Sequence, residues 1–368
     1  MEKAKLFVIY LINLPTLIKF REFFLYFYDI FIDLKNIPQN KKYLINKQHG
    51  FVGGYCSRQF ISYTPKLVKD NIEKQTKELF RDKKSAELYL KVFNRHLYSS
   101  LLLPGWSEYF EKEIIFKKLL KQIFLKIKSK TIFEGNYLTV KNQNVPYCLE
   151  FLGGPKYFLP KNWFEISVFC FDLGLVYLTK RQLKYLKSRH IVDAGAYIGD
   201  SSIVLARYTD KKVYAFEPSL ENFELLNKTI NLNNVKDKIV PCMVALDSKV
   251  GTTGLLGAGA GARVTAQSKV KIKTHTLDSY LTNRDSKIGL IKMDVEGYEM
   301  NILLGCRKII LTDHPIMLLS IYHSAEQYLD IPRYMKNNYG DIYNFTFIDC
   351  NPVHPLAEKV LLCLPKNL

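Results

Sequence analysis

The second half of the chain alternates between two hydrophobic patterns. Short runs of apolar residues are followed by longer segments in which apolar residues recur at steps of three or four. The first pattern is typical of buried strands and the second of amphipathic helices. Strands that alternate with helices form an open, mostly parallel sheet with helices on both faces. We predict seven strands, at His190–Ala194, Lys212–Glu217, Ile239–Ala245, Ile288–Asp294, Ile316–Tyr322, Tyr343–Asp349 and Lys359–Leu364, and helices at about Ser201–Tyr208, Leu220–Leu232, Met300–Ile310 and Ala325–Asn337.

The first half of the chain has a different pattern. Phe20–Leu34 predicts a helix with an aromatic face, which either lies on a membrane surface or packs on its own protein. The acidic residues on its other side favour packing. Glu108–Lys128 predicts a helix with a lysine face, which suits anionic lipid, a phosphorylated substrate or solvent. Thr131–Leu152 predicts strands joined by a turn at Glu134-Gly135-Asn136, and Gly251–Ala262 predicts a flexible loop.

Charge divides the 368 residues in the same way. The net charge is +18, and residues 1–189 hold 33 basic and 16 acidic side chains against 20 and 19 in residues 190–368. We therefore predict a basic, mainly helical region at 1–140, with a recognition, membrane-surface or oligomerisation role. Residues 141–368 are predicted to form the ligand-binding domain.

The spacing of the cysteines and the N-terminal residues indicate the cellular compartment in which the protein is expected. The seven cysteines include no C-x-x-C pair, which argues against a zinc site, a redox pair or a disulfide framework. Leu6–Ile18 is uncharged but too short to span a bilayer, and no small-residue cleavage site follows it. We expect a cytoplasmic protein with reduced thiols. Peripheral contact with the inner membrane face remains open.

Candidate ligand-binding residues follow the first two predicted strands. Gly195 and Gly199 form a turn whose spacing differs from the G-x-G-x-x-G of dinucleotide-binding folds. Asp193, at the strand end, would repel phosphate and attract an ammonium group. Glu217, 24 residues later, can accept hydrogen bonds from a ribose diol. The set favours S-adenosylmethionine over NAD or ATP, although each acid alone could be a helix cap or a surface charge.

Candidate catalytic residues follow the fourth and fifth predicted strands. Asp294 and Glu296 point the same way if the chain stays extended, and His323 ends the next strand. A carboxylate or a neutral imidazole could take the proton of a hydroxyl that attacks a sulfonium methyl group. Alternatively, the two acids orient the following helix and the histidine is structural.

These segments resemble a known family. Asp193–Asp200, Phe216–Pro218, Thr276-Leu277-Asp278 and Lys292–Glu299 are similar to successive motifs of the FkbM-type methyltransferases. His314-Pro315 and Ile321-Tyr322-His323 resemble one bacterial branch, whereas Phe347–Pro352 departs from its Arg-His ending. The resemblance covers roughly residues 165–340. It implies a class I methyltransferase-type fold, S-adenosylmethionine as cofactor, and O-methylation of a sugar or related hydroxyl. It also implies that Asp193, Gly195, Gly199 and Glu217 contact the cofactor and that Asp294, Glu296 and His323 lie toward the acceptor. We predict Ala196 and Ala245 as further cofactor-binding residues.

The leading hypothesis is thus an O-methyltransferase acting on a sugar of a bacterial surface-glycan precursor. Its partner would be an acceptor glycan or a nucleotide- or lipid-linked sugar. The basic first half of the chain would attract such an acceptor when it is anionic. A nucleic-acid or amine methyltransferase is disfavoured, because the loop after the fourth strand is acidic and would repel phosphates. A non-catalytic membrane-surface module is the third class. We predict no metal site, because no cluster has convincing metal-ligand spacing. The acceptor and the oligomeric state stay open.

Overall fold

The computed structural model describes residues 72–99, 125–134, 137–257, 259, 263–264, 268, 270–351 and 357–368. The helix predicted at Phe20–Leu34 and most of that predicted at Glu108–Lys128 lie outside these residues. The predicted end of the second helix is wrong, because residues 125–126 form a turn and Ile127 makes an isolated antiparallel bridge to Phe151. Within the described ranges, no helix combines the length and apolar character needed to cross a bilayer.

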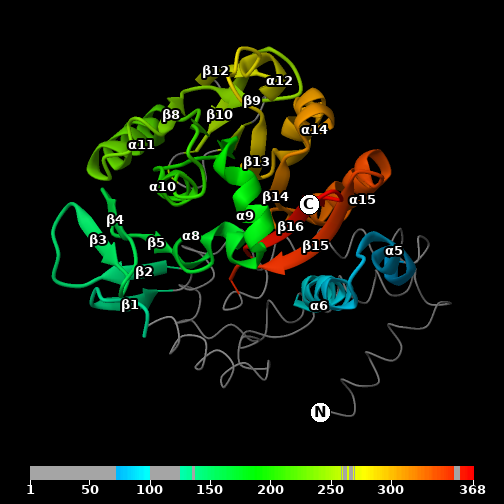
Figure 1. The fold of residues 1–368 in the computed structure, drawn as a ribbon, viewed down its shortest axis with the longest axis horizontal. Helices are drawn as coiled ribbons and strands as arrows, with labels where there is room; N and C mark the ends of the chain where they lie inside the picture. The colour runs from blue at the N-terminus through cyan, green and yellow to red at the C-terminus, as the bar shows by residue number, and fades with distance from the viewer. Residues whose placement is uncertain are drawn as a thin grey trace, which may run out of the picture.

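A seven-stranded sheet forms the centre of the structure, in the order β15-β16-β14-β13-β6-β7-β8 (Figure 1). Strands β14, β13, β6, β7 and β8 are parallel, and β16 runs antiparallel to both of its neighbours. This confirms the predicted mostly parallel sheet. The bounds are β6 His190–Ala194, β7 Val213–Phe216, β8 Ile239–Cys242, β13 Ile288–Met293, β14 Ile316–Ser320, β15 Tyr343–Asp349 and β16 Lys359–Pro365.

The apolar runs of the central strands are explained by burial on both faces. Every residue of β6, β13 and β14 is buried, as expected for parallel strands between two helical layers. Successive residues enter different cores: Ile191 packs with α10 and α11, whereas Val192 packs with α13, α14 and α15. These helices are α10 Asp200–Leu205, α11 Leu220–Leu232, α13 Glu299–Leu304, α14 Arg307–Asp313 and α15 Ala325–Tyr339, with α9 Lys180–Lys187 and α12 Leu277–Tyr280 beside them.

The helix predicted at Met300–Ile310 is two helices, α13 and α14. The break lies at Gly305, where the backbone approaches another segment so closely that a Cβ atom would be 2.1 Å from the carbonyl oxygen of Asp247. The apolar residues on either side, such as Ile302 and Ile309, still face one core. The periodicity therefore continues across a break that is caused by a tertiary contact.

A small four-stranded sheet, in the order β11-β10-β12-β9, lies beside the main one and differs from two predictions. Strands β10 Gly251–Leu256 and β12 Val270–His275 pair from Gly251–Thr274 to Leu255–Val270, so Gly251–Leu256 is not a loop. Backbone hydrogen bonds hold this glycine-rich segment extended despite its weak strand propensity. The strand predicted at Ile239–Ala245 is also divided, because Ala245 belongs to β9 Ala245–Leu246 and pairs with β12. The fourth strand is β11 Arg263–Val264.

Two hairpins precede the main sheet and lie beside its lower part in Figure 1. Strands β1 Thr131–Glu134 and β2 Tyr137–Val140 pair with Glu134 opposite Tyr137, which confirms the hairpin predicted there. Strand β5 Phe164–Glu165 pairs with β2, and β3 Tyr147–Glu150 pairs with β4 Lys156–Leu159. The helix α8 Ile166–Phe169 and the 3-10 helix η3 Asp172–Tyr177 lead from β5 into the domain.

Helices α5 Ile72–Leu79 and α6 Lys83–Ser99 pack against the sheet domain. Tyr89 of α6 stacks on Tyr328 of α15 with ring centroids 4.4 Å apart. Each hydroxyl donates to the backbone carbonyl of the other residue, at 2.6 and 2.7 Å. The boundary predicted at residue 140 stays a prediction, but this part of the basic region shares a core with the domain.

We expect Tyr89→Phe to lower the free energy of unfolding by about 1–3 kcal/mol, because the buried carbonyl oxygen of Tyr328 loses its donor. Chemical denaturation monitored by circular dichroism measures the change. Tyr147→Phe, at a half-buried tyrosine of β3, is the matched control. Equal stability losses in the two variants would contradict a specific contribution from the tyrosine pair.

Candidate active site

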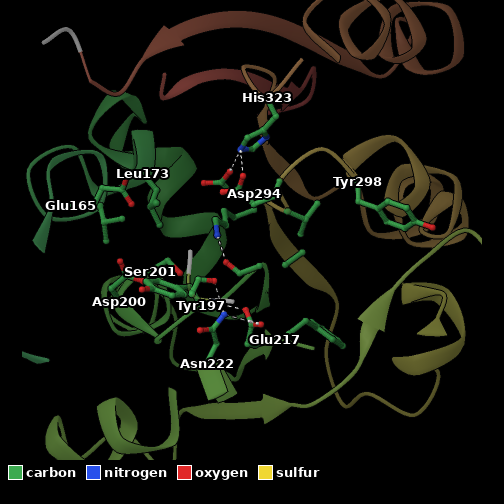
Figure 2. Close-up of a pocket in the computed structure, with 18 of the residues that line it drawn as sticks. Glu165, Leu173, Tyr197, Asp200, Ser201, Glu217, Asn222, Asp294, Tyr298 and His323 are labelled. Carbon is green, nitrogen blue, oxygen red and sulfur yellow. Dashed lines mark hydrogen bonds and ion pairs between the residues drawn. The ribbon is translucent and has the colours of Figure 1, made fainter. Parts of the chain in front are cut away.

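A cavity of about 890 Å³ lies at the carboxyl ends of the central strands (Figure 2). Gly195 follows β6, Glu217 follows β7, Asp294 follows β13 and His323 follows β14, and all four line it. Open parallel sheets bind ligands at this edge. The predicted position of the site after the strands is therefore where the structure has its cavity.

Glu217 and Asn222 form one end of the cavity. The Oε2 atom of Glu217 accepts from the backbone N–H of Tyr197 at 3.0 Å, and Oε1 accepts from that of Ser219 at 2.9 Å. Burial raises the pKa of this carboxyl to about 7. The buried Oδ1 atom of Asn222 has no hydrogen-bond partner within the described part of the chain. Two fixed acceptors thus face the space where the two hydroxyls of a ribose can donate, so these residues fit the predicted S-adenosylmethionine.

The two glycines of the first turn have different roles. Gly195 has φ +80°, and a Cβ atom there would be 1.9 Å from the carbonyl oxygen of Asp294. Glycine is therefore needed where the first turn meets the end of β13. Gly199 has φ +87°, and its Cβ atom would meet Leu226 of α11 at 2.6 Å. It packs one helix on another, and neither it nor the buried Ala196 is among the lining residues, whereas Ala245 is.

Asp193 lies inside the protein and not in the wall of the cavity. Its carboxylate is fully buried, 3.0 Å from Nζ of Lys292, and it accepts from the hydroxyls of Ser201 and Ser202 at 2.6 Å each. This corrects the expectation that Asp193 meets the cofactor directly. Lys292 also donates to the carbonyl oxygen of Gly195 at 2.7 Å. Burial lowers the pKa of Lys292, but Asp193 and Asp294 raise it more, so the lysine is charged.

His323 lies at the other end of the cavity among three carboxylates. Its Nδ1 atom is 3.0 Å from Glu299, and Nε2 is 3.3 Å from Asp294 and 3.9 Å from Glu296. Burial lowers the pKa of His323, but Glu299 and Glu296 raise it further, to about 10. The side chain is therefore an imidazolium at neutral pH. This direction of the pKa disfavours a neutral His323 as the proton acceptor, and the catalytic role predicted for the residue stays a prediction.

Glu299 pairs with the Nδ1 atom of His323 and holds the histidine ring in place. It is fully buried, accepts from the backbone N–H of Val295 at 3.0 Å, and accepts from the side-chain amide of Gln327. Sequence reasoning gave this residue no role. The signal was present, because an acid at the first position of a helix whose other inward residues are apolar must have a partner inside.

Glu296 has the backbone geometry of a strained turn. Its φ is +53°, and Gly297 follows with φ +105°. A left-handed residue that is not glycine costs about 1–2 kcal/mol and is frequent at functional sites. Burial, with a smaller effect of Asp294, raises the pKa of Glu296 to about 7 although His323 opposes it. The side chains of Asp294 and Glu296 remain 24% and 30% exposed and both line the cavity, although the chain turns at Glu296 and is not extended there as the prediction assumed.

One group within the described ranges has the composition of a metal site. Asp294, Glu299 and His323 each offer one ligand atom, and these atoms lie within 4.8 Å of one another. The same atoms form the ion pairs given above, which account for the arrangement by charge pairing. The prediction of no metal stays a prediction.

One wall of the cavity was not predicted. Tyr137 of β2 and Glu165 of β5 line it, together with Trp163 just before β5 and Glu358 just before β16. Burial raises the pKa of both glutamates. Glu358 raises the pKa of Glu165 further, and Asp294 raises that of Glu358. No motif marks these residues, because they lie far apart in sequence and in segments without a recognisable pattern.

Comparison with known proteins identifies the fold and the domain. Residues 193–343 match the family model of the methyltransferase FkbM domain. The hexuronic acid methyltransferase AglP of Haloferax volcanii is 28% identical over 118 residues, which are 31% of this chain and 48% of AglP. The chain thus spans about half the length of this curated relative. The crystal structure of methyltransferase FkbM from Methylobacillus flagellatus KT superposes with a TM-score of 0.51 at 16% identity, over 83% of this chain and 62% of that one. Residues 193–343 therefore form a methyltransferase FkbM domain on the class I methyltransferase-type α/β fold.

Proposed function

We propose that the chain is an S-adenosylmethionine-dependent O-methyltransferase whose acceptor is a sugar hydroxyl of a bacterial surface-glycan precursor. One observation carries the proposal: a single cavity has ribose-type acceptors, Glu217 and Asn222, at one end and the cluster of Asp294, Glu296 and His323 at the other. The name of AglP, a hexuronic acid methyltransferase, supports a sugar as acceptor.

Glu296 is the proposed general base. When bound, S-adenosylmethionine supplies a methyl group on a positively charged sulfur. Glu296 takes the proton of the acceptor hydroxyl, and its pKa of about 7 suits a base that works near neutral pH. The His323 imidazolium, 3.3 Å from Asp294 and 3.9 Å from Glu296, holds the two carboxylates in position as a positioning residue.

An acceptor screen tests the proposed function. The purified chain is incubated with S-adenosylmethionine and panels of nucleotide sugars, lipid-linked sugars and amines, and products are identified by mass spectrometry. We expect one methyl group to be added to an oxygen of a sugar. Methylation of amines alone would overturn the assignment to oxygen, and absence of S-adenosylmethionine binding would overturn the whole proposal.

The pH dependence of kcat should show the titration of Glu296 and that of His323 as two separate changes. At saturating cofactor we expect kcat to rise as pH passes about 7, because the Glu296 carboxyl must lose its proton to act as a base. We expect kcat to fall as pH approaches about 10, where His323 loses its charge. Glu296→Gln should remove the rising limb. A profile that is flat between pH 6 and pH 8 would contradict Glu296 as the base.

Two predictions about location and partners remain part of the proposal. We propose a cytoplasmic protein whose basic residues 1–140 approach an anionic acceptor or the inner membrane face. Most of these residues lie outside the described ranges, so liposome sedimentation of the full chain, with and without anionic lipid, is the appropriate test. The predicted lack of nucleic-acid binding is tested by titration with DNA and RNA.

A further inference from the structure

The unpredicted wall of the cavity lies outside the part of the chain that matches the FkbM domain. Tyr137, Trp163 and Glu165 come before residue 193, and Glu358 comes after residue 343. The matched domain supplies the ribose-type acceptors and the proposed base. The remaining wall is therefore positioned to contact the acceptor, and Figure 2 shows Glu165 on the side of the cavity away from Tyr298.

Trp163 gives this wall a flat apolar surface. The side chain lines the cavity, and the residue is 43% exposed. Its ring meets that of Tyr137 edge to face, with centroids 4.4 Å apart and an angle of 87° between the planes. Such a contact fixes the indole while leaving part of it open. An open indole in a cavity is a surface on which the C–H face of a sugar ring can stack.

The ionisable groups that line the cavity disfavour an anionic ring. Its lining contains six carboxyl groups, and within the described part of the chain its only cations are Lys292 and His323. Lys292 pairs with Asp193, and His323 pairs with Glu299 and Asp294. Among the residues that the structure describes, no further cation lines the cavity to compensate an added anion, and a buried anion without a partner is unfavourable. The six are Glu165, Asp200, Glu217, Asp294, Glu296 and Glu358.

We infer that the acceptor ring stacks on Trp163 and that the ring is a neutral hexose, whose hydroxyls donate to Glu165 and Glu358, and not a uronic acid. This inference rests on the proposed function and narrows its substrate class. It also separates this chain from AglP, whose name specifies a hexuronic acid. A negative charge elsewhere on the acceptor, such as a phosphate outside the cavity, is compatible with it.

A binding experiment tests the inference without catalysis. The chain has two tryptophans, so Trp106→Phe leaves Trp163 as the sole indole. This variant is titrated with methyl glucoside and with methyl glucuronide at saturating S-adenosylhomocysteine, and the fluorescence emission of Trp163 is recorded. We expect the glucoside to change the emission of Trp163 and to bind at least about tenfold more tightly than the glucuronide, because like charges repel across an interface. Equal or tighter binding of the glucuronide would overturn the inference, as would no emission change with either ligand.

A double variant tests the charge directly. Glu165→Gln/Glu358→Gln keeps the shape of both side chains and leaves neither able to ionise, so we expect the glucoside-to-glucuronide preference to fall several-fold. The control Glu224→Gln/Glu326→Gln makes the same two substitutions at exposed positions and should leave the ratio unchanged. A ratio unaffected by the first variant would contradict the role of the pair.

S-adenosylhomocysteine binding, measured by calorimetry on the same samples, distinguishes failure of the proposed function from failure of this inference. If the parent protein does not bind S-adenosylhomocysteine, the proposed function is refuted. If it binds normally and prefers the glucuronide, only this inference is refuted.

Discussion

Replacing Glu296 by glutamine is expected to lower kcat by about 10²- to 10⁴-fold, the usual contribution of a positioned general base. Glutamine has the size of glutamate but cannot accept the hydroxyl proton. The left-handed backbone at this position is unchanged, because both residues carry the same strain there. Calorimetry should show unchanged affinity for S-adenosylhomocysteine, since Glu296 lies at the end of the cavity away from Glu217.

Asp294→Asn is the matched control for this prediction. The amide keeps an oxygen that can accept from the Tyr322 hydroxyl, which is 3.3 Å from Asp294. We expect a smaller loss of kcat and a retained rise of kcat near pH 7. If Asp294→Asn instead loses more activity than Glu296→Gln and abolishes that rise, Asp294 is the base.

Glu217→Ala is expected to weaken S-adenosylmethionine binding by about 100-fold or more. Two ribose hydroxyls would lose a charged acceptor, and each hydrogen bond to a charged group contributes about 1.5–3 kcal/mol. The variant also removes the acceptor of the Tyr197 and Ser219 backbone N–H groups, so folding must be checked by thermal denaturation. Affinity is measured by calorimetry.

Asn222→Ala separates ligand binding from folding of the turn. Asn222 does not accept from the Tyr197 backbone, although its amide donates to the carbonyl oxygen of Gly259 at 2.9 Å, and its buried Oδ1 atom has no partner among the described residues. We expect a weaker but measurable loss, about tenfold, as for one hydrogen bond. Unchanged affinity in a folded Glu217→Ala protein would remove the basis of the cofactor assignment.

The sheet could be predicted because its signal is local. Strand β6 and helix α11 begin and end at the predicted residues, since each has a continuous apolar run or a regular apolar period. The break at Gly305 could not be predicted, because a contact with Asp247, distant in sequence, causes it. The strand at Gly251–Leu256 was missed for a related reason: pairing with β12 holds glycines extended.

The site was predictable to the extent that its acids follow strands. Glu217, Asp294 and Glu296 line the cavity as topology requires. The direction of Asp193 was not readable from that rule, because a residue within a strand can face either the cavity or the core. Lys292 offered the missing signal: a lysine in an otherwise apolar strand must be paired inside the protein. The position of Glu358 depends on the antiparallel last strand and has no local signal.

The contact between Gly195 and Asp294 has a consequence for protein engineering. With a hypothetical Cβ atom only 1.9 Å from the neighbouring carbonyl, the loops on either side of it are locked to each other and tolerate little redesign. Attempts to make this scaffold accept new alcohols should therefore leave that junction intact and diversify Tyr137 of β2 and Glu165 of β5, which line the cavity from outside the matched domain.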